Sequence, residues 1–540
     1  MSENKKKRFA LKQNRWIILI IIVACVTGFI YYRQQAQEFG FDPALAQPAA
    51  APTANEAAKT AKDILIVADQ YDATTMDPIG HNDVPSSRAS YSLYDTLIFA
   101  DNEGNISPGL AESWEFLSGT EYRFNLRRGV NFHNGDELKA EDVRHAIMRA
   151  TTEDGARIAT YSQNVKDVQI IDDHTVILHL KKVDYSFFSS LAHGWAAIYS
   201  KRAFEELGES FGMEPVGAGS GPFKFVSWQK GNRYILERFD DYWGPKPGFK
   251  TLEVRSVPEP TSRTIALETA DADIAFPIVH NDLRRVEENE NLVLYRKPQN
   301  STTYVGFNTT KPPFHNIDVR RAIFAALDVT GIQAASYQGV GKVPGSLIPS
   351  AIKYSINDEA APHAQDVELA KKLLAEAGAE NLNLEIWTNE RKERVDSATI
   401  IQAQLDEIGI TSEIRVLEWG AYLNGLMEKR HDLFILAWTV SVPDPNYAVS
   451  GLLETSAIGA SNYTFFSDAK MDELLEKGRS LPDGDERAAL YREMQLYINE
   501  QLPKIYLHND ESIAGTQKNV KGFTPRSDEK HSFREVYFEE

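Results

Sequence analysis

The chain of 540 residues has almost no cysteine: Cys25 is the only one. A disulfide framework of the kind that holds small secreted domains together is therefore excluded. Basic residues are also in deficit, because 58 Lys and Arg face 77 Asp and Glu and the net charge is −19. Nucleic acid and anionic lipid both attract basic surfaces, so we expect neither to bind the folded part. The hydrophobic content of 42% is enough for large cores without metal staples.

The common catalytic motifs are missing as well. Ser220 lies in a glycine-rich stretch, but Ala218 and Pro222 stand where a nucleophile elbow needs glycines. Gly341-Lys342 lacks the first glycine and the following hydroxyl of a phosphate-binding loop, and no H-E-x-x-H zinc motif occurs. We therefore expect a protein that is not an enzyme and that has no cofactor and no metal.

Long apolar runs are scarce too, and the one that occurs covers residues 16–32 behind a basic start. Its length is at the lower limit of the roughly 17–25 residues that span a bilayer. Basic residues on the N-terminal side predict that this end stays in the cytoplasm. The body is then expected to be periplasmic or extracytoplasmic, and residues 16–32, if retained, would anchor it to the inner membrane.

Three fates of this segment, residues 1–46, remain open. It is retained as an anchor, cut as a signal peptide after Ala46, or lipidated at Cys25. Cys25 has apolar residues on both sides, which favours a buried thiol in an anchor helix over lipidation. Residues 47–62 are rich in Pro and Ala and are expected to be a semi-extended linker.

The remainder is expected to form an α/β protein with two lobes. Residues 63–300 contain mostly strand patterns, whereas residues 301–505 alternate between helix and strand patterns. Such alternation predicts a mainly parallel sheet with helices on both faces. Residues 506–540 are expected to return to the first lobe, and a ligand site is expected between the lobes.

The hydrophobic periodicity and the residues that favour the ends of helices and strands predict individual elements of this folded part. A helix is expected to begin at Ala140, because Glu141 and Asp142 suit a first turn. Further helices are expected at residues 367–377, 398–408, 474–477 and 487–499. Strands are expected at residues 64–67, 122–126, 168–171, 176–180, 223–226, 234–236, 382–387, 412–416 and 433–438.

The apolar run at residues 433–438 ends in Trp438, and a loop with two prolines and several polar groups follows it. An open α/β sheet binds ligands beyond the carboxyl ends of its strands. An aromatic side chain beside a rigid polar loop suits the wall of a small-molecule site. We therefore expect Trp438 and the loop after it to contact ligand.

Several linked motifs resemble one family. They are Gly109–Glu115, Phe124–Gly135, Ala140–Val143, Gly221–Phe223, Asp241–Gly244, Val305–Thr309, Val319–Ala322 and Pro443–Pro445. Their order resembles that of the family 5 extracellular solute-binding proteins, the peptide- and nickel-binding receptors of ABC importers. The resemblance covers about residues 63–535.

This resemblance implies a fold like that of periplasmic binding proteins. It is a clam-shell of two α/β lobes, with an extra subdomain in the first lobe and the single N-terminal apolar helix before it. Two hinge segments, expected near residues 299–306 and 503–509, join the lobes, and ligand is enclosed when they close.

The resemblance also points to ligand residues. Peptide-binding members often have an Asp three residues after the tryptophan that matches Trp438, and it pairs with the ligand's α-ammonium. Ser441 stands there, and a hydroxyl cannot supply a full counter-charge. Asp444 could replace that Asp, although in the family its place is usually structural. The further expected ligand residues are Thr439, Trp387, Asn389, Tyr71 and Asp72.

The expected function is that of a receptor which binds a peptide or peptide-like small molecule and delivers it to ABC permease subunits. We expect it to act as a monomer. Ser441 leaves modified peptides, glutathione-like molecules, sugars, opines or a metal chelate such as a nickel chelate open as ligands. A membrane-tethered sensor or peptide chaperone with the same fold also remains open.

Overall fold

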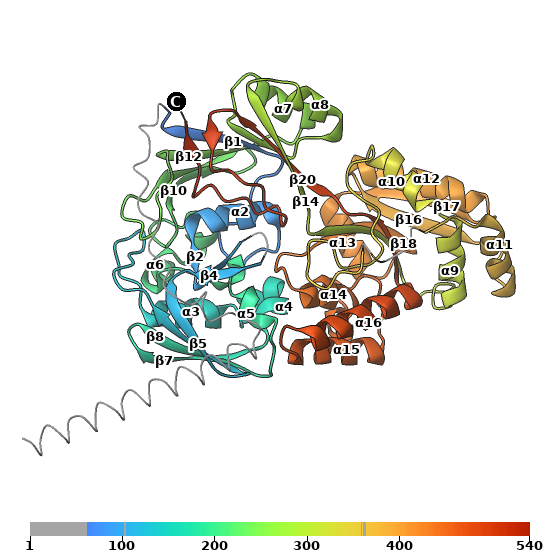
Figure 1. Cartoon of the computed structure of the whole chain (residues 1–540), viewed down its shortest axis with the longest axis horizontal. Helices are drawn as coiled ribbons and strands as arrows, with labels where there is room; N and C mark the ends of the chain where they lie inside the picture. Colours follow the sequence, from blue (N-terminus) through green and yellow to red (C-terminus); the bar gives the residue numbers. More distant parts are fainter. Residues whose placement is uncertain (1–61, 102–103, 358, 360–362, 540) are drawn as a thin grey trace, which may run out of the picture.

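The computed structural model describes residues 62–101, 104–357, 359 and 363–539 (Figure 1). The expected apolar anchor at residues 16–32 and nearly all of the expected linker lie outside the described residues. Among the helices in those ranges, none combines the length and apolar character needed to cross a bilayer.

The first lobe is built on a seven-stranded sheet with the strand order β10-β11-β12-β1-β13-β20-β14. Its strands are β1 Ile64–Asp69, β10 Phe223–Gln229, β11 Arg233–Arg238, β12 Thr251–Ser256, β13 Ile274–Phe276, β14 Leu292–Pro298 and β20 Glu511–Gln517. β1 runs parallel to both of its neighbours, β12 and β13. The chain places β10–β12 on one side of β1 and β13 on the other, so the carboxyl ends of β1 and β13 form a topological switch point.

An extra subdomain is inserted between β1 and β10. It is a four-stranded antiparallel sheet, β5-β6-β8-β7, with helix α3 against it. The elements are β5 Ala111–Ser118, β6 Glu121–Leu126, α3 Ala140–Arg149, β7 Val165–Asp172 and β8 Thr175–Leu180. Alternate residues of β6 are buried, including Tyr122 and Phe124, as the period-2 pattern predicted.

Short elements complete the first lobe. They are α2 Val84–Leu93, β2 Asp95–Thr96, β3 Ile98–Ala100, β4 Ile106–Pro108, α4 Ala159–Ser162, α5 Phe187–Ser190, β9 Ala197–Ile198, α6 Lys201–Leu207, α7 Pro260–Glu268, α8 Leu283–Glu287, β21 Val520–Lys521 and β22 Tyr537–Phe538.

The second lobe is built on a five-stranded sheet with the order β17-β16-β18-β15-β19. Its strands are β15 Ser301–Phe307, β16 Asn383–Asn389, β17 Thr411–Leu417, β18 Leu433–Thr439 and β19 Lys504–His508. β16, β17 and β18 are parallel, but β15 is antiparallel to both β18 and β19. The expected parallel arrangement is therefore confirmed for β16, β17 and β18 and wrong for β15, which brings the chain into the lobe.

Helices cover both faces of this sheet, as expected. One face packs against α9 Ile317–Ala326, α10 Val329–Ser336, α11 Val367–Glu376 and α12 Lys392–Asp406, and the other against α13 Trp419–Met427, α14 Pro445–Leu453, α15 Ala469–Ser480 and α16 Asp485–Gln501. Within β18, Leu433 and Ile435 face the first group, and Phe434 and Leu436 face the second. Burial on both faces explains why β18 is continuously apolar.

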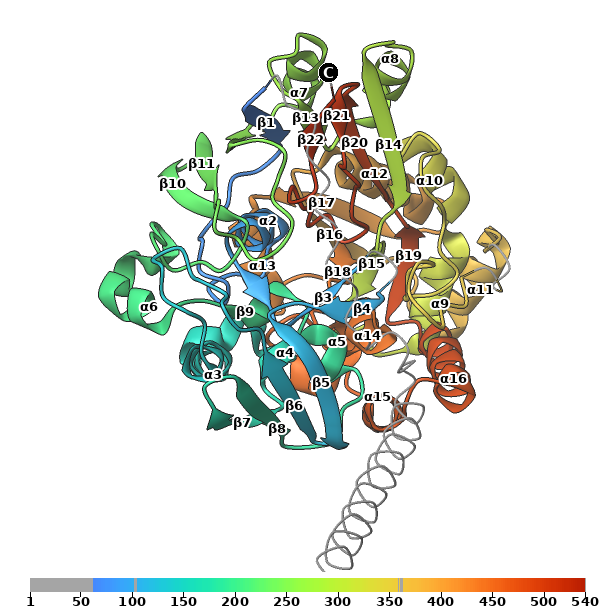
Figure 2. The same cartoon turned by 60° about the vertical axis from the view of Figure 1, so that its left-hand side comes forward.

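The chain crosses between the two sheets at two adjacent points (Figure 2). β14 passes into β15 through Gln299 and Asn300, and β19 passes into β20 through Asn509 and Asp510. The Gln299 amide donates to the Asp510 carbonyl over 2.9 Å, so the crossings are hydrogen-bonded to each other. The boundary expected at residue 505 falls inside β19, which still pairs with β15.

The lobes are closed against each other in this structure. The Lys182 ammonium in the extra subdomain lies 3.2 Å from the Glu476 carboxylate of α15. The Tyr185 amide donates to the Arg479 carbonyl at 2.8 Å. The lobes are thus connected by the two crossings and also touch through the extra subdomain.

Candidate functional site

The candidate site lies where the carboxyl ends of both sheets meet. In the second lobe, β17 and β18 lie on opposite sides of β16, so the switch point is between β16 and β18. The loop after β18 reaches Asn300 in the first crossing, since the Val440 amide donates to the Asn300 carbonyl at 2.7 Å. The Asn300 amide in turn donates to the Ser527 carbonyl of the first lobe at 2.7 Å. One residue therefore joins the site loops of both lobes.

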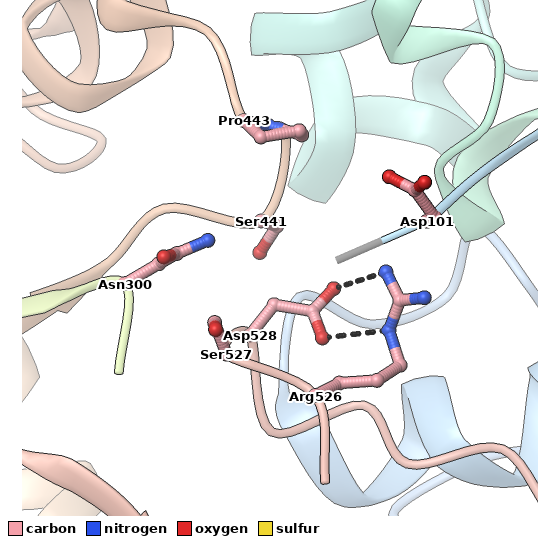
Figure 3. A pocket seen from close by; sticks show the side chains of 7 residues that line it. All are labelled: Asp101, Asn300, Ser441, Pro443, Arg526, Ser527 and Asp528. Atoms are coloured by element: carbon pink, nitrogen blue, oxygen red, sulfur yellow. Dashed lines mark hydrogen bonds and ion pairs between the residues drawn. The ribbon is translucent and has the colours of Figure 1, made fainter. Parts of the chain in front are cut away.

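A cavity of about 10 Å³ lies at this junction (Figure 3). Its lining comes from both lobes and the crossing: Asp101, Asn300, Ser441, Pro443, Arg526, Ser527 and Asp528. A volume of this size corresponds to about one water molecule. A larger ligand can enter here only if the lobes separate or the lining side chains move.

The loop at residues 524–531 supplies the first-lobe side of the cavity. The Arg526 guanidinium donates to both carboxylate oxygens of Asp528, at 3.0 and 3.2 Å, and to the Ala100 carbonyl at 3.2 Å. Burial alone would raise the pKa of Asp528, but Arg526 and Lys530 outweigh it and hold that pKa below the ordinary value. The charges of Arg526 and Asp528 therefore neutralise each other beside the cavity.

Sequence reasoning did not identify residues 524–531 as part of the site. The available signal was the close run of charges from Arg526 to Lys530 in a segment expected to return to the first lobe. His531 of the same loop stacks edge-on against Phe276, the last residue of β13, with ring centroids 4.5 Å apart. The loop thus occupies the switch point of the first lobe.

Ser441, one of the expected ligand residues, lines the cavity. Trp438 lies at the end of β18, but its indole Nε1 donates to the Tyr447 carbonyl of α14 at 3.1 Å. A Cβ at Gly451 would come within 2.9 Å of the same ring, so the indole packs closely against α14. Thr439 pairs with Ser301 in the β15–β18 ladder. Trp438 and Thr439 therefore support the loop that carries Ser441.

Asp444 has a complete set of partners inside the second lobe. Its carboxylate accepts two hydrogen bonds from Arg487, at 2.9 and 3.0 Å, and both side chains are buried. It also caps α14 by accepting from the Asn446 amide at 2.9 Å. A ligand ammonium at Asp444 would therefore have to compete with Arg487, and the alternative role of Asp444 as a ligand residue stays a prediction.

Trp387 is also engaged within the second lobe. Its side chain is buried, its Nε1 donates to the Glu385 carboxylate at 2.7 Å, and its ring fills the space beside Gly425 of α13. The described contacts of Trp387 are thus within the second lobe, and the expectation that it stacks on ligand stays a prediction. β16 ends two residues later at Asn389, whose side-chain oxygen accepts from Arg394 at 3.0 Å.

Tyr71 and Asp72 follow β1 in the first lobe. Tyr71 is 57% exposed, and the Asp72 carboxylate accepts from the Trp228 indole at 3.0 Å and from the Gly231 amide at 2.6 Å. Asp72 therefore fastens the turn after β1 to the β10–β11 hairpin. Neither residue lines the described cavity.

The start of α12 offers a favourable place for an anion beside Asn389. Its N-cap residue, Arg391, makes no side-chain cap, and Arg394 is buried with no hydrogen-bond partner for its Nε among the described residues. Burial and the neighbouring Arg391 lower the pKa of Arg394. A helix N-terminus with an incompletely satisfied guanidinium is suited to a carboxylate.

Comparisons with known proteins agree with this architecture. Residues 105–460 match the family model described as bacterial extracellular solute-binding proteins, family 5 Middle. The Heme-binding protein A of Haemophilus influenzae is 31% identical over 81% of this chain and 85% of its own length. The Dipeptide-binding protein of Escherichia coli is 28% identical over 84% of this chain and 90% of its own length.

A solved structure extends the agreement to three dimensions. It is the ABC transporter-associated periplasmic binding protein DppA of Helicobacter pylori, in complex with the peptide STSA. It superimposes with a TM-score of 0.82 and 29% identity, covering 89% of this chain and 99% of its own.

Asp444→Asn should separate a structural role from a ligand role. Removing one charge of a buried, bidentate pair leaves Arg487 uncompensated, which costs on the order of 3–5 kcal/mol. We expect a large fall in the free energy of unfolding, measured by urea denaturation.

Glu359→Gln is the matched control, because the Glu359–Arg492 pair is about half exposed. Exposed pairs contribute roughly 0–1 kcal/mol, so this variant should stay close to wild type. An Asp444→Asn variant with wild-type stability and lost ligand binding would instead assign Asp444 to the ligand.

Proposed function

Because the chain belongs to the bacterial extracellular solute-binding proteins of family 5, we propose that it is the extracytoplasmic receptor of an ABC importer. It encloses a peptide or peptide-like small molecule between its lobes and delivers it to permease subunits in the membrane. It acts as a monomer and carries out no covalent chemistry, in keeping with a family of substrate-binding proteins. The observation that supports this most is the cavity at the crossings, whose lining residues come from both lobes.

Because residues of both lobes line the cavity, ligand binding is linked to the movement of the lobes relative to each other. A ligand that contacts Ser441 in one lobe and Arg526 in the other stabilises the closed arrangement relative to the open one. The closed arrangement brings these two residues to one cavity, so a permease that distinguishes the closed from an open arrangement of the lobes would detect an occupied receptor. The short crossings are suited to such a hinge movement.

The polarity of the site favours a peptide-like ligand. Six of the seven side chains that line the cavity are polar or charged, with Pro443 the exception. Such a lining matches amides and hydroxyls better than a flat apolar ring system. The start of α12, with Arg394, supplies a place for the carboxylate that most peptides carry. The similarity to a dipeptide-binding protein and to a peptide-bound structure supports the same class.

A direct test identifies what the protein retains. Purified protein is incubated with a random pool of di- to tetrapeptides, washed and denatured, and the released molecules are identified by mass spectrometry. We expect defined peptides or peptide-like molecules at about one per protein molecule, confirmed by calorimetry with the synthetic compound.

Ser441→Trp provides the matched variant, because a large side chain at the cavity should block closure on ligand and abolish retention. Ser467→Trp, at an exposed serine of the same lobe that does not line the cavity, should retain as much as wild type. Equal retention by wild type and Ser441→Trp, or none by wild type, would contradict the proposed function.

We further propose that residues 16–32 anchor the receptor to the inner membrane. The proposal is supported by the basic start before the apolar run and by a family that is extracellular. The described part begins at Lys62, which pairs with Asp273 of the first lobe at 2.7 Å. The anchor would therefore attach to the first lobe and leave the second free to move.

Cell fractionation tests the anchor. The protein should sediment with membranes, resist extraction by salt and dissolve in detergent, and protease added to spheroplasts should digest its body. Release by osmotic shock of a chain that begins at Gln47 would instead show a signal peptide cut after Ala46. Protection of the body from protease would overturn the location itself.

A further inference from the structure

The cavity where the lobes meet has the size of one polar head group. Its volume of about 10 Å³ corresponds to about one water molecule, and an ammonium, like water, has a single heavy atom. Residues of the first lobe, the second lobe and the crossing between them line it. The closed lobes can therefore enclose a head group of this size.

Acceptor groups in the lining call for a ligand that donates hydrogen bonds. The Asn300 side chain is 5% exposed, and its Oδ1 has no hydrogen-bond partner among the described residues. A buried acceptor without a partner is costly unless a ligand or water donates to it. Ser441 adds a hydroxyl that can accept as well as donate. In the view of Figure 3, Ser441 lies between Asn300 and Asp101.

The charges of the lining favour a cation over an anion. Two carboxylates, Asp101 and Asp528, line the cavity together with one guanidinium, Arg526. Arg526 donates to both oxygens of Asp528, at 3.0 and 3.2 Å. Lys530, which does not line the cavity, also lowers the pKa of Asp528. Arg526 and Lys530 therefore both act at the Asp528 end of the lining.

Asp101 is oriented by the turn between β3 and β4. Its carboxylate accepts from the backbone amide and from the side-chain amide of Asn105, at 2.8 Å each. Both of these donors are neutral, so they bring no positive charge to the carboxylate. A carboxylate has about four lone-pair sites, which leaves it able to accept from a ligand as well. The Asp101 side chain is also exposed.

The same turn touches the second lobe. A Cβ at Gly104 would come within 3.0 Å of the Pro443 side chain, so the turn packs closely against the loop after β18. Pro443 lines the cavity too. Closure of the lobes therefore brings the Asp101 carboxylate of one lobe and the Ser441 hydroxyl of the other to one cavity.

We propose that this cavity is an ammonium pocket, in which Asp101 supplies the counter-charge and Ser441 and Asn300 supply neutral acceptors for the N–H groups of the ligand. The ligands are then peptides or peptide-like molecules with a free primary amine at the enclosed end. An enclosed ammonium needs a full counter-charge, and here the first lobe supplies it because position 441 does not. The ammonium bridges the lobes, so its binding favours closure. This inference rests on the proposed function and assigns its substrate class.

The test uses one random tripeptide pool in two forms, with a free α-amine and N-acetylated, mixed in equal amounts. Wild-type protein should retain the free-amine form about tenfold more than the acetylated form, as measured by mass spectrometry. Asp101→Asn removes the charge with little change of shape and should abolish most of this preference. Adding Ser441→Asp to that variant returns a carboxylate to the cavity from the other lobe and should restore the preference.

Asp271→Asn is the matched control, because it removes one charge from another exposed turn of the first lobe, where the carboxylate accepts from the neutral Thr269 hydroxyl at 2.9 Å. It should keep the wild-type preference, and thermal melting checks that every variant is folded.

Equal retention of both forms by wild type, or a preference for acetylated peptides, overturns the ammonium pocket and leaves the receptor function intact. This comparison needs no variant, so it holds even if a substitution at Asp101 weakens the turn. An unchanged preference in folded Asp101→Asn overturns the role of Asp101. Retention of neither form overturns the proposed function and this inference with it.

Discussion

The two chain crossings constrain the whole molecule. In the described residues from Lys62 to Glu539, the backbone passes between the two large sheets only at Gln299–Asn300 and Asn509–Asp510. Asn509 fastens the second crossing to the first, because its side-chain amide donates to the Ser301 carbonyl and the Thr302 hydroxyl, each at 2.8 Å. Each lobe can therefore keep its own core while the lobes move about a short, doubly connected hinge.

The same constraint determines where recognition takes place. Strand β15 begins at the crossing and pairs with β18, so the loop after β18 is held next to Asn300. The returning chain after β20 brings Ser527 to the other side of Asn300. The loop after β18 and the segment after β20 are thus both hydrogen-bonded to Asn300, although they are far apart in the sequence. The cavity at this point is lined by residues of both lobes.

Buried and half-buried charges near the cavity are paired within each lobe. Asp444 and Arg487 neutralise each other inside the second lobe, and Arg526 and Asp528 do so beside the cavity. At position 441, where peptide-binding members of the family often have an Asp, this chain has Ser, so that position supplies no carboxylate.

Much of the fold could be predicted from the sequence, because the hydrophobic pattern of each element reflects which of its faces are buried. The alternation in β6 and the apolar run of β18 follow directly from one and two buried faces. Gly378 ends α11 with a φ of +63°, as its position predicted. The antiparallel position of β15 could not be predicted, because local periodicity does not report the direction of a neighbouring strand.

The candidate site was less predictable, because it depends on contacts between remote residues. Trp387 is an aromatic residue of the kind that lines ligand sites, yet its ring is buried against α13. The pairing of Asp444 with Arg487 joins positions with no common local pattern. Only Ser441 among the expected ligand residues lines the described cavity, and the segment at Arg526–Asp528 was missed.

The most direct test of the central claim, a hinged receptor that closes on its solute, is small-angle X-ray scattering. Ligand-free protein, prepared by unfolding and refolding, is compared with the same protein saturated with the peptide that it retains. The account predicts a smaller radius of gyration in the saturated sample, because ligand contacts with both lobes favour the closed state. An unchanged radius at demonstrated saturation would contradict it.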